Sequence, residues 1–426
     1  MIRSWEVGTV GHLIRFMKVN KYFPFACIYF FVNSVALPFG MTYTALFAPF
    51  FYAWILLKRR KEVVLPFIMI LAPFIIVQVL YVDVVRKVYF YSLLNVVFVY
   101  VFCQAVYTFL NVCLDVERIF RKLLIINFIC CLVSIALYFT PWDHLVWIQQ
   151  ELTEGVKDFR RLKLFTYEAS YYATLFVPLF CFYFLQYLFR ENAIRGWLLL
   201  PMIFLPLLLS FSFGVMAALL ISGLLTFVFY ARSLIRKRRI FNGLIFFGGF
   251  SVALVSIVYF FFQNSFLVLR LVNIFSGRDS SGKGRTSDAF FLANKLLEKK
   301  NEYWGVGFGQ IKVMGSDVIR HYYMYGENFV ATIPNAVAET YTILGWAGVT
   351  LRMLVEVFFF FQTRVWTNYF RLWLFLFMFI FQFAGSFITN VAEYVIWILA
   401  FTNVFEQFDV QREKNIVTQP SLPAIG

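Results

Sequence analysis

The sequence has few charged residues and a large excess of apolar ones. Only 14% of its 426 residues are Asp, Glu, Lys or Arg, whereas 61% are hydrophobic. A water-soluble domain is about one quarter charged and cannot bury so much apolar surface. The chain also contains 57 Phe and 24 Tyr, and such bulky side chains suit lipid-facing helices with aromatic belts at the interface. The composition therefore predicts an all-α polytopic membrane protein.

Cysteine is sparse and is absent from the polar parts of the sequence. Each cysteine lies in or at the end of an apolar run, which is typical of a small hydrophobic residue and not of a disulfide framework or a metal site. The sequence also has no His/Cys cluster suited to zinc and no Asp-x-Asp pair. We therefore expect no metal and no other cofactor. The cysteines are Cys27, Cys103, Cys113, Cys130, Cys131 and Cys181.

Acidic residues are outnumbered, which gives a net charge of +15. The basic residues fall in short clusters between apolar runs instead of along one soluble face, so the pattern argues against nucleic acid and for a lipid bilayer as the partner.

Membrane-spanning helices need about 20 apolar residues to cross a hydrocarbon core about 30 Å thick. About twelve runs of this kind occur, or ten to twelve if the short ones join across kinks. The first is followed by Pro38 and Gly40 without a signal-cleavage pattern, so we expect a retained first helix. The runs are 22–37, 42–57, 63–82, 88–110, 123–140, 171–189, 197–211, 215–230, 241–262, 336–361, 372–387 and 391–405.

Lys and Arg concentrate in alternate short loops, which by the positive-inside rule stay in the cytoplasm. Both termini are then cytoplasmic, and two longer segments face outward. We call them the small polar segment (141–167) and the large polar segment (263–335). The sequence thus predicts an N-terminal bundle over 1–262, C-terminal helices over 336–406 and a mobile cytoplasmic tail over 407–426, in a bacterial cytoplasmic (inner) membrane whose periplasmic face carries the function.

The large polar segment has three parts. Residues 276–285 form a Gly/Ser stretch with three cations, Arg278, Lys283 and Arg285, which predicts a flexible solvated loop. Ser287 is positioned to cap an amphipathic helix over 288–300. The glycines of 304–309 then predict a turn, and because this turn follows a helix and not a strand, it is not a dinucleotide site.

The small polar segment ends in Arg160, Arg161 and Lys163, followed by Glu168 where the chain re-enters the membrane. One interpretation is a solvated anchor near lipid phosphates. Another is an anion site, because arginine binds phosphate oxygens bidentately, and Arg161 and Arg285 on one membrane face can converge on a pyrophosphate.

Three runs resemble a known family in order and in sidedness. The run from Arg161 to Lys163, Phe165 and Glu168-Ala169-Ser170 resembles the Arg and Phe-x-Glu-Pro-Ser segment of Wzy-type polysaccharide polymerases, with Ala169 in place of Pro. Gly284-Arg285 and 304–309 resemble the Gly-Arg and Gly-x-Gly-x-Gly loop of O-antigen polymerases and ligases. The third run, Asn335 to Glu339 and then Leu344 to Gly348, resembles their His-Asn and Leu-Gly-x-x-Gly helix entry.

This resemblance implies a GT-C-like glycosyltransferase that joins undecaprenyl-pyrophosphate-linked sugar repeats into O-antigen, capsule or exopolysaccharide. It implies neither nucleotide sugars nor a metal, and it makes a chain-length regulator a candidate partner. The ligases carry a histidine before the Asn of the third motif, where this chain has Pro334. That departure weighs against the ligase alternative.

The clamp expected from the resemblance consists of Arg161 and Arg285, which stabilise the leaving pyrophosphate. Glu168 or His321 is then the base that accepts the proton of the incoming sugar hydroxyl, and the choice between them stays open. His321 can also be a surface histidine without a special role. Further substrate-binding residues are expected to be Arg160, Lys163, Arg278, Tyr322, Tyr323, Asn335 and Glu339.

Charges within the predicted spans are rare. Arg352 precedes Glu356 by one helical turn, which predicts a mutually satisfied pair on the helix surface. Glu339 and Glu393 lie near the outer ends of their spans and can line the same cavity as the loops.

The alternatives to a polymerase are an O-antigen ligase, a flippase or other transporter of lipid-linked sugars, and a membrane protein without catalysis. Transporters tend to have internal repeats, which we do not find in this sequence. Sugar identity, linkage and oligomeric state are not determined by the sequence.

Overall fold

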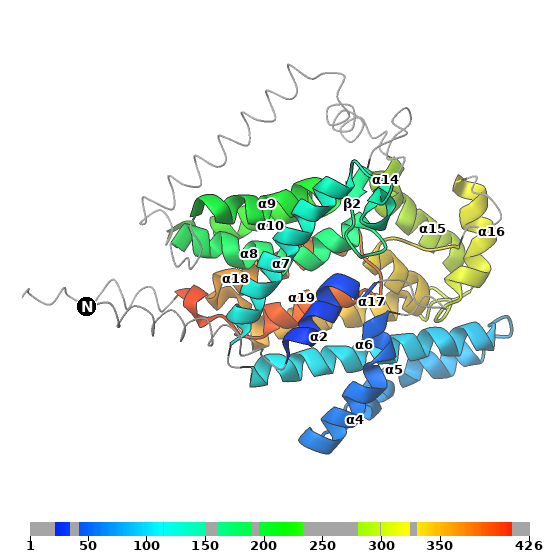
Figure 1. Cartoon of the computed structure of the whole chain (residues 1–426). Coiled ribbons are helices and arrows are strands. Elements are labelled where there is room, and N and C mark those ends of the chain that lie inside the picture. Colours follow the sequence, from blue (N-terminus) through cyan, green and yellow to red (C-terminus); the bar gives the residue numbers. More distant parts are fainter. Residues whose placement is uncertain are drawn as a thin grey trace, which may run out of the picture.

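The computed structural model describes residues 22–34, 42–113, 115–149, 160–189, 196–232, 280–298, 300–323 and 330–410. This part of the chain is mostly helical (Figure 1). Its α-helices are α2 Phe23–Cys27, α3 Tyr43–Leu46, α4 Ala48–Arg59, α5 Val64–Val79, α6 Arg86–Val112, α7 Val116–Leu137, α8 Ala169–Phe189, α9 Gly196–Ser210, α10 Phe213–Phe229, α14 Ser280–Arg285, α15 Ser287–Leu297, α16 Ile311–Tyr323, α17 Ala336–Gln362, α18 Tyr369–Phe381 and α19 Val391–Phe401.

The described residues also form several short turns of helix and two short strands. A π-helical turn η1 (Ile28–Val32) continues α2, and the 3-10 turns are η3 Asp143–Leu145, η4 Val365–Thr367 and η5 Glu406–Phe408. The small polar segment contains a two-stranded antiparallel ribbon of β1 (Trp147–Gln149) and β2 (Arg160–Leu162), in which Ile148 is opposite Arg161. The sequence analysis did not predict these strands.

Four of the helices, α6, α7, α8 and α17, are long and apolar enough to cross a membrane. Shorter apolar helices accompany them, so the fold is that of a helical membrane protein. Ten of the twelve predicted runs overlap apolar helices of the described residues, with ends that differ by up to seven positions, and the run 42–57 overlaps α3 and α4. The remaining run, 241–262, lies outside the described residues. The predicted count of twelve spans stays a prediction.

Helix α8 is the centre of the bundle. Inside the protein, 83% of its most apolar stretch is buried, compared with 28 to 44% for the other three long helices. It packs against α9, α10, α18 and α19, and the rings of Phe176 and Phe182 are fully buried there. All residues of α8 from Ala169 to Gln186 are buried, so neighbouring helices and not lipid cover this helix, including its N-terminal end.

The large polar segment folds back onto the bundle in a second apolar cluster. Leu292 and Leu296 of α15 face α17, and α16 packs against α15. Figure 1 shows α14, α15 and α16 together at one end of the bundle. The amphipathic helix expected over 288–300 is therefore confirmed as α15, and its apolar face is covered by the bundle.

Helix α17 is broken at Gly345, whose φ of +66° is not helical. The glycine turn of 304–309 docks into this break. Val306 N donates to Thr342 O at 2.8 Å and Gly307 N to Ile343 O at 3.1 Å, while Trp346 N donates to Glu302 O at 2.9 Å. A membrane helix can be interrupted only where the protein satisfies the exposed backbone groups, and this turn does so.

Glycine is required on both sides of this contact. A Cβ on Gly345 would lie 2.3 Å from the Tyr303 carbonyl carbon, and a Cβ on Gly305 would lie 2.3 Å from the Ile343 oxygen. Gln78 of α5 adds to the joint, because its Nε2 donates to both Trp304 O and Ile343 O. The glycine-rich turn and the Leu-Gly-x-x-Gly run are thus two halves of one joint.

Two local expectations were wrong. Residues 280–285 form the short helix α14 and not a flexible loop, because α14 packs against α15. The residue before α15 is Thr286, without a side-chain cap, and Ser287 is the first helical residue. The Ser287 hydroxyl instead donates to the Asp288 carboxylate at 3.3 Å.

Candidate functional site

An ion pair joins the two polar segments at the N-terminal end of α8. Arg285 Nη2 lies 2.9 Å from Glu168 Oε1, and the two side chains are 26% and 19% exposed. Arg285 ends α14, and Glu168 immediately precedes α8, where its carbonyl accepts from Tyr172 N. The positive end of the α8 dipole favours a carboxylate at this position. The pairing of these segments, 117 residues apart, comes only from the fold.

The carboxyl of Glu168 is held in its ionised form. Burial by itself would raise its pKa. The charges of Arg285 and Arg161, together with a hydrogen bond from Ser170, outweigh burial, so that the pKa of Glu168 lies below its ordinary value. Both arginines predicted to form the clamp therefore act on the same carboxylate.

A small hollow of about 50 Å³ opens beside this pair. Its walls come from the start of α8, from Arg285 and from the connection between α18 and α19. We call it the Arg285 hollow. It is lined by Tyr167, Glu168, Ser170, Tyr171, Thr174, Arg285, Pro334, Phe381, Ser386, Phe387 and Asn390.

The connection between α18 and α19 was missed by the sequence analysis. Ser386 and Asn390 bring hydroxyl and amide groups to the Arg285 hollow, and Asn390 Nδ2 donates to Ser386 Oγ at 2.7 Å. The signal was present in the sequence, because polar residues and Gly385 interrupt an apolar stretch there. Its relation to Arg285 was not visible without the fold.

The side chain of Asn335 holds three backbone segments together through hydrogen bonds. Its Oδ1 accepts from Ala338 N and caps α17, while its Nδ2 donates to Arg285 O at 2.8 Å and to Phe383 O at 2.6 Å. The side chain is fully buried, and these three bonds use both amide hydrogens and the oxygen. Asn335, which we expected to bind substrate, thus fixes the backbone of Arg285 relative to the bundle.

The basic residues of the small polar segment have different surroundings and different partners. Arg161 is 4% exposed, and its Nε donates to Ser210 O at 3.0 Å. Arg160 instead pairs with Asp143 at 2.5 Å, and its guanidinium lies over the Tyr138 ring. Lys163 is half-buried, and burial lowers its pKa. Arg161 thus reaches Glu168 electrostatically, whereas Arg160 has a carboxylate partner on its own segment.

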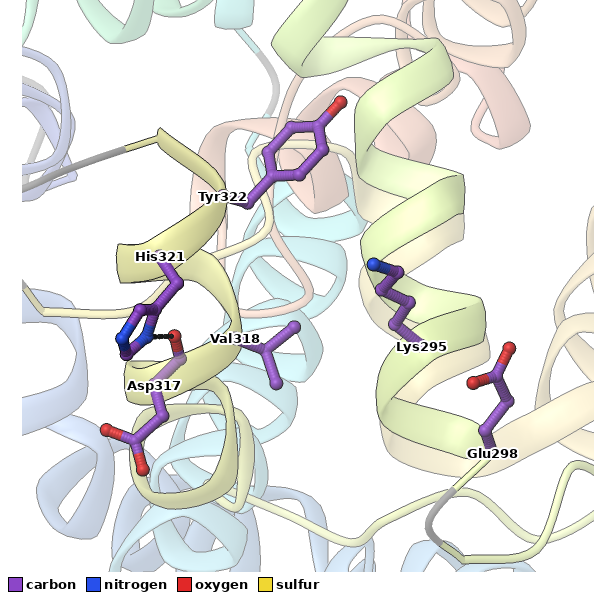
Figure 2. A pocket seen from close by; sticks show the side chains of 6 residues that line it. All are labelled: Lys295, Glu298, Asp317, Val318, His321 and Tyr322. Atoms are coloured by element: carbon purple, nitrogen blue, oxygen red, sulfur yellow. Dashed lines mark hydrogen bonds between the residues drawn. The ribbon is translucent and has the colours of Figure 1, made fainter.

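His321, the other candidate base, is in a different place. It lies near the end of α16, is exposed, and its Nδ1 is 2.6 Å from Asp317 O. It lines a hollow between α15 and α16 (Figure 2) and is not among the residues around the Arg285 hollow. Tyr322 shares the α15–α16 hollow, while Tyr323 Oη donates to Asp288 Oδ2 at 3.3 Å.

A buried charged network lies deeper, between α17, α18 and α19. Arg352 pairs with Glu356 at 3.1 Å and with Glu393, and its Nε donates to Gln382 Oε1 at 2.8 Å. Ser386 Oγ donates to Glu393 Oε2 at 2.6 Å, which connects this network to the wall of the Arg285 hollow.

The predicted pair of Arg352 and Glu356, one turn apart on the same helix, is confirmed, and Glu356 is 5% exposed because neighbouring helices cover the pair. The sequence could not show the tertiary partners that bury it. Glu339 accepts from Ile388 N at 2.6 Å and so also holds the α18–α19 connection.

Among the described residues, no group of three or more His, Cys, Asp or Glu side chains is placed to hold a metal ion. Arg278, which we expected to assist the clamp, lies outside them. Comparison of the chain with protein-family models and with curated protein sequences finds no match.

Proposed function

We propose that this protein polymerises undecaprenyl-pyrophosphate-linked oligosaccharide repeats by glycosyl transfer at the periplasmic face of a bacterial inner membrane. The observation that carries the proposal is the convergence of Arg285 and Arg161 on Glu168 at the N-terminal end of a buried apolar helix. In this proposal the chain crosses the membrane about twelve times, with both termini in the cytoplasm, as the distribution of Lys and Arg favours.

The Arg285 hollow suits a pyrophosphate at a bilayer surface. Among the described residues, Glu168 is the side-chain partner of Arg285, which leaves guanidinium donors that a phosphate oxygen can use bidentately. The buried Ser210 carbonyl holds the neighbouring Arg161 in place. Charge that develops on the leaving pyrophosphate is then met by donors already fixed by the fold.

Glu168 is the better candidate base of the two. Arg285 lowers the pKa of Glu168, and a pyrophosphate that binds Arg285 would both compete for the guanidinium and add negative charge nearby. Both effects raise the affinity of the carboxylate for a proton. Glu168 would thus become basic when the donor is bound, as general-base catalysis of hydroxyl attack requires.

One observation favours a transporter as the second candidate. Helix α17 is interrupted at Gly345, and interrupted helices are common at transporter binding sites. In this protein, however, the turn of 304–309 and Gln78 fill the break with hydrogen bonds. The break thus serves as a joint between two parts of the protein, and Gly345 is not among the residues that line the Arg285 hollow. A ligase is disfavoured by Pro334, which lines that hollow where the ligases carry a histidine.

The test is reconstitution of purified protein with defined undecaprenyl-pyrophosphate-linked repeats, scored as a ladder of polymer lengths. We expect Arg285→Ala to reduce chain growth by about a hundredfold or more, because loss of one charge-stabilising donor at a reacting centre has this size of effect. Lys283→Ala is the matched control, because Lys283 is an exposed cation on the same short helix.

Normal polymerisation by both Arg285→Ala and Arg161→Ala would overturn the clamp. In cells, loss of the gene separates the rival transferases. Single lipid-linked repeats should accumulate without a polymerase, whereas long lipid-linked chains should accumulate without a ligase.

A further inference from the structure

The α15–α16 hollow has a volume of about 580 Å³, compared with about 50 Å³ for the Arg285 hollow. It is lined by Lys295 and Glu298 of α15 and by Asp317, Val318, His321 and Tyr322 of α16. In Figure 2 Lys295, Val318 and Tyr322 point toward the space between the two helices, with Tyr322 at the end nearer the start of α15, whereas Asp317, His321 and Glu298 lie at its margins and point outward. The proposed clamp uses none of these residues.

The Tyr322 ring is exposed on one side and supported on the other. Its side chain is 40% exposed, while its ring lies 5.5 Å from that of Phe291 and 4.9 Å from that of Tyr323. Two neighbouring rings fix its orientation, so Tyr322 presents a flat apolar surface at little cost in side-chain entropy.

The polar groups of the α15–α16 hollow suit a ligand rich in neutral hydroxyls. Glu298 and Asp317 contribute acceptors, and the Asp317 side chain is 78% exposed. Lys295 Nζ lies 4.6 Å from the Phe291 ring and contributes donors, with His321 close by. Asp317 is also paired with Arg320 at 3.6 Å, so two carboxylates are balanced by two cations and the surroundings of the hollow favour a neutral ligand over a highly charged one. A sugar matches this set, because its hydroxyls donate and accept while its C–H face stacks on an aromatic ring.

The α15–α16 hollow is also aligned with the Arg285 hollow. Tyr323 Oη reaches Asp288, three residues after Arg285, and a Cβ on Gly284 would lie 3.1 Å from this hydroxyl. Arg285 ends α14 just before α15 begins at Ser287, and Lys295 lies eight residues further along α15, which is about 12 Å along that helix. A chain of several sugars attached to a phosphate at Arg285 can extend along α15 over this distance.

From these observations we infer that the α15–α16 hollow binds the oligosaccharide of the lipid-linked substrate, with Tyr322 as its stacking platform. The inference rests on the proposed function and deepens it, because it assigns the pyrophosphate and the glycan to separate hollows. His321 then contacts sugar hydroxyls at a distance from the reacting bond, and Glu168 remains the candidate base.

The test uses lipid-free oligosaccharides of two to six sugars, released by mild acid from the surface polysaccharide of the source cell. Their binding to the full-length protein in detergent is followed by saturation-transfer NMR and titration. Tyr322→Ala should weaken binding about tenfold, as the loss of one aromatic platform predicts. Tyr322→Phe keeps the ring and should bind nearly as well as the parent.

Two controls separate binding from folding. Tyr303→Ala removes another exposed tyrosine, 68% exposed and outside the hollow, and should leave binding unchanged. The thermal unfolding of each variant should match the parent, because both side chains are at the surface. Unchanged binding by Tyr322→Ala, or an equal loss with Tyr303→Ala, would overturn the inference.

The same variants distinguish this inference from the proposed function. With lipid-linked repeats, Tyr322→Ala should still form glycosidic bonds but give shorter ladders, whereas Arg285→Ala should give no ladder. A full-length ladder from Tyr322→Ala together with unchanged oligosaccharide binding would refute the glycan site and leave the clamp intact. Tyr322-dependent binding by a protein that makes no polymer would support the glycan site and refute the polymerase.

Discussion

Two arginine–glutamate groups in this protein differ in how completely their charges are satisfied. Arg352, deep between three helices, has Glu356, Glu393, Gln382 and Thr340 as partners and is 12% exposed. Arg285 is 26% exposed and has Glu168 as its described side-chain partner. A fully partnered buried cation holds helices together. A cation with one partner at the edge of a hollow can exchange that partner for a ligand.

Helix α17 links the two groups. Its N-cap residue Asn335 holds the Arg285 carbonyl, and Arg352 lies on the same helix beyond the break at Gly345. Arg352 therefore stabilises the helix packing, whereas Arg285 is available to bind a ligand. The joint of Gly345 and the turn of 304–309 lies along α17 between Asn335 and Arg352.

The largest effect on stability is expected from Arg352→Leu. This change leaves Glu356 and Glu393 buried without their cation, which costs about 3–5 kcal/mol when one member of a buried ion pair is removed. Thermal unfolding in detergent, followed by Trp fluorescence, measures the loss.

The control for Arg352→Leu is Arg285→Ala, which should change stability by less than about 1 kcal/mol because its pair is partly exposed. Adding Glu356→Gln and Glu393→Gln to Arg352→Leu should recover part of the loss. Equal destabilisation by Arg352→Leu and Arg285→Ala would contradict the contrast between the two groups.

A smaller loss is expected from Gly345→Ala, which tests the joint between the two arginines. The new Cβ would meet the Tyr303 backbone at 2.3 Å at a φ of +66°, and such backbone strain costs about 1–3 kcal/mol. Because the joint positions both arginines, we expect stability and polymer formation to fall together.

Gly214→Ala is the matched control for Gly345→Ala. Nothing lies within 4 Å of the Cβ position there, and alanine favours a helix more than glycine does. If Gly345→Ala unfolded at the same temperature as Gly214→Ala, the strained joint would be refuted.

The smallest effect concerns Glu168 and acid. The pKa of Glu168 is lowered in the folded protein from an ordinary value of 4.5, so its ion pair contributes fully above about pH 4.5. The contribution is lost as the pH falls through the lower folded-state pKa. Glu168→Gln should therefore lose up to about 1 kcal/mol at neutral pH and nothing below the folded-state pKa.

Unfolding of the parent and of Glu168→Gln at pH 7 and at pH 3 measures the effect of acid. The difference between the two proteins should shrink at the lower pH. A difference that stays constant would mean that folding does not lower the pKa of Glu168, contrary to the electrostatics of the site.

Prediction from the sequence worked where the physical signal is local. Apolar runs give helices such as α6 and α8 because backbone groups in lipid must bond within their own segment, and the amphipathic spacing of 288–297 gave α15. It failed at Ser287 and at 280–285, where packing against neighbouring helices outweighs local propensity. Glu356 was predicted as a partner of Arg352, but Gln382 and Glu393 were not, because they lie 30 and 41 residues further along the chain.

The sequence by itself determined that this protein is a helical membrane protein with two polar segments, one carrying Arg161 and followed directly by Glu168 and the other carrying Arg285, because hydropathy and charge are properties of single stretches of chain. Only the tertiary structure decided that these three residues converge, that Asn335 holds Arg285 in place, and that His321 lies in a separate hollow. Such distances depend on how α8, α14, α15 and α17 pack together, and packing is a property of the whole chain.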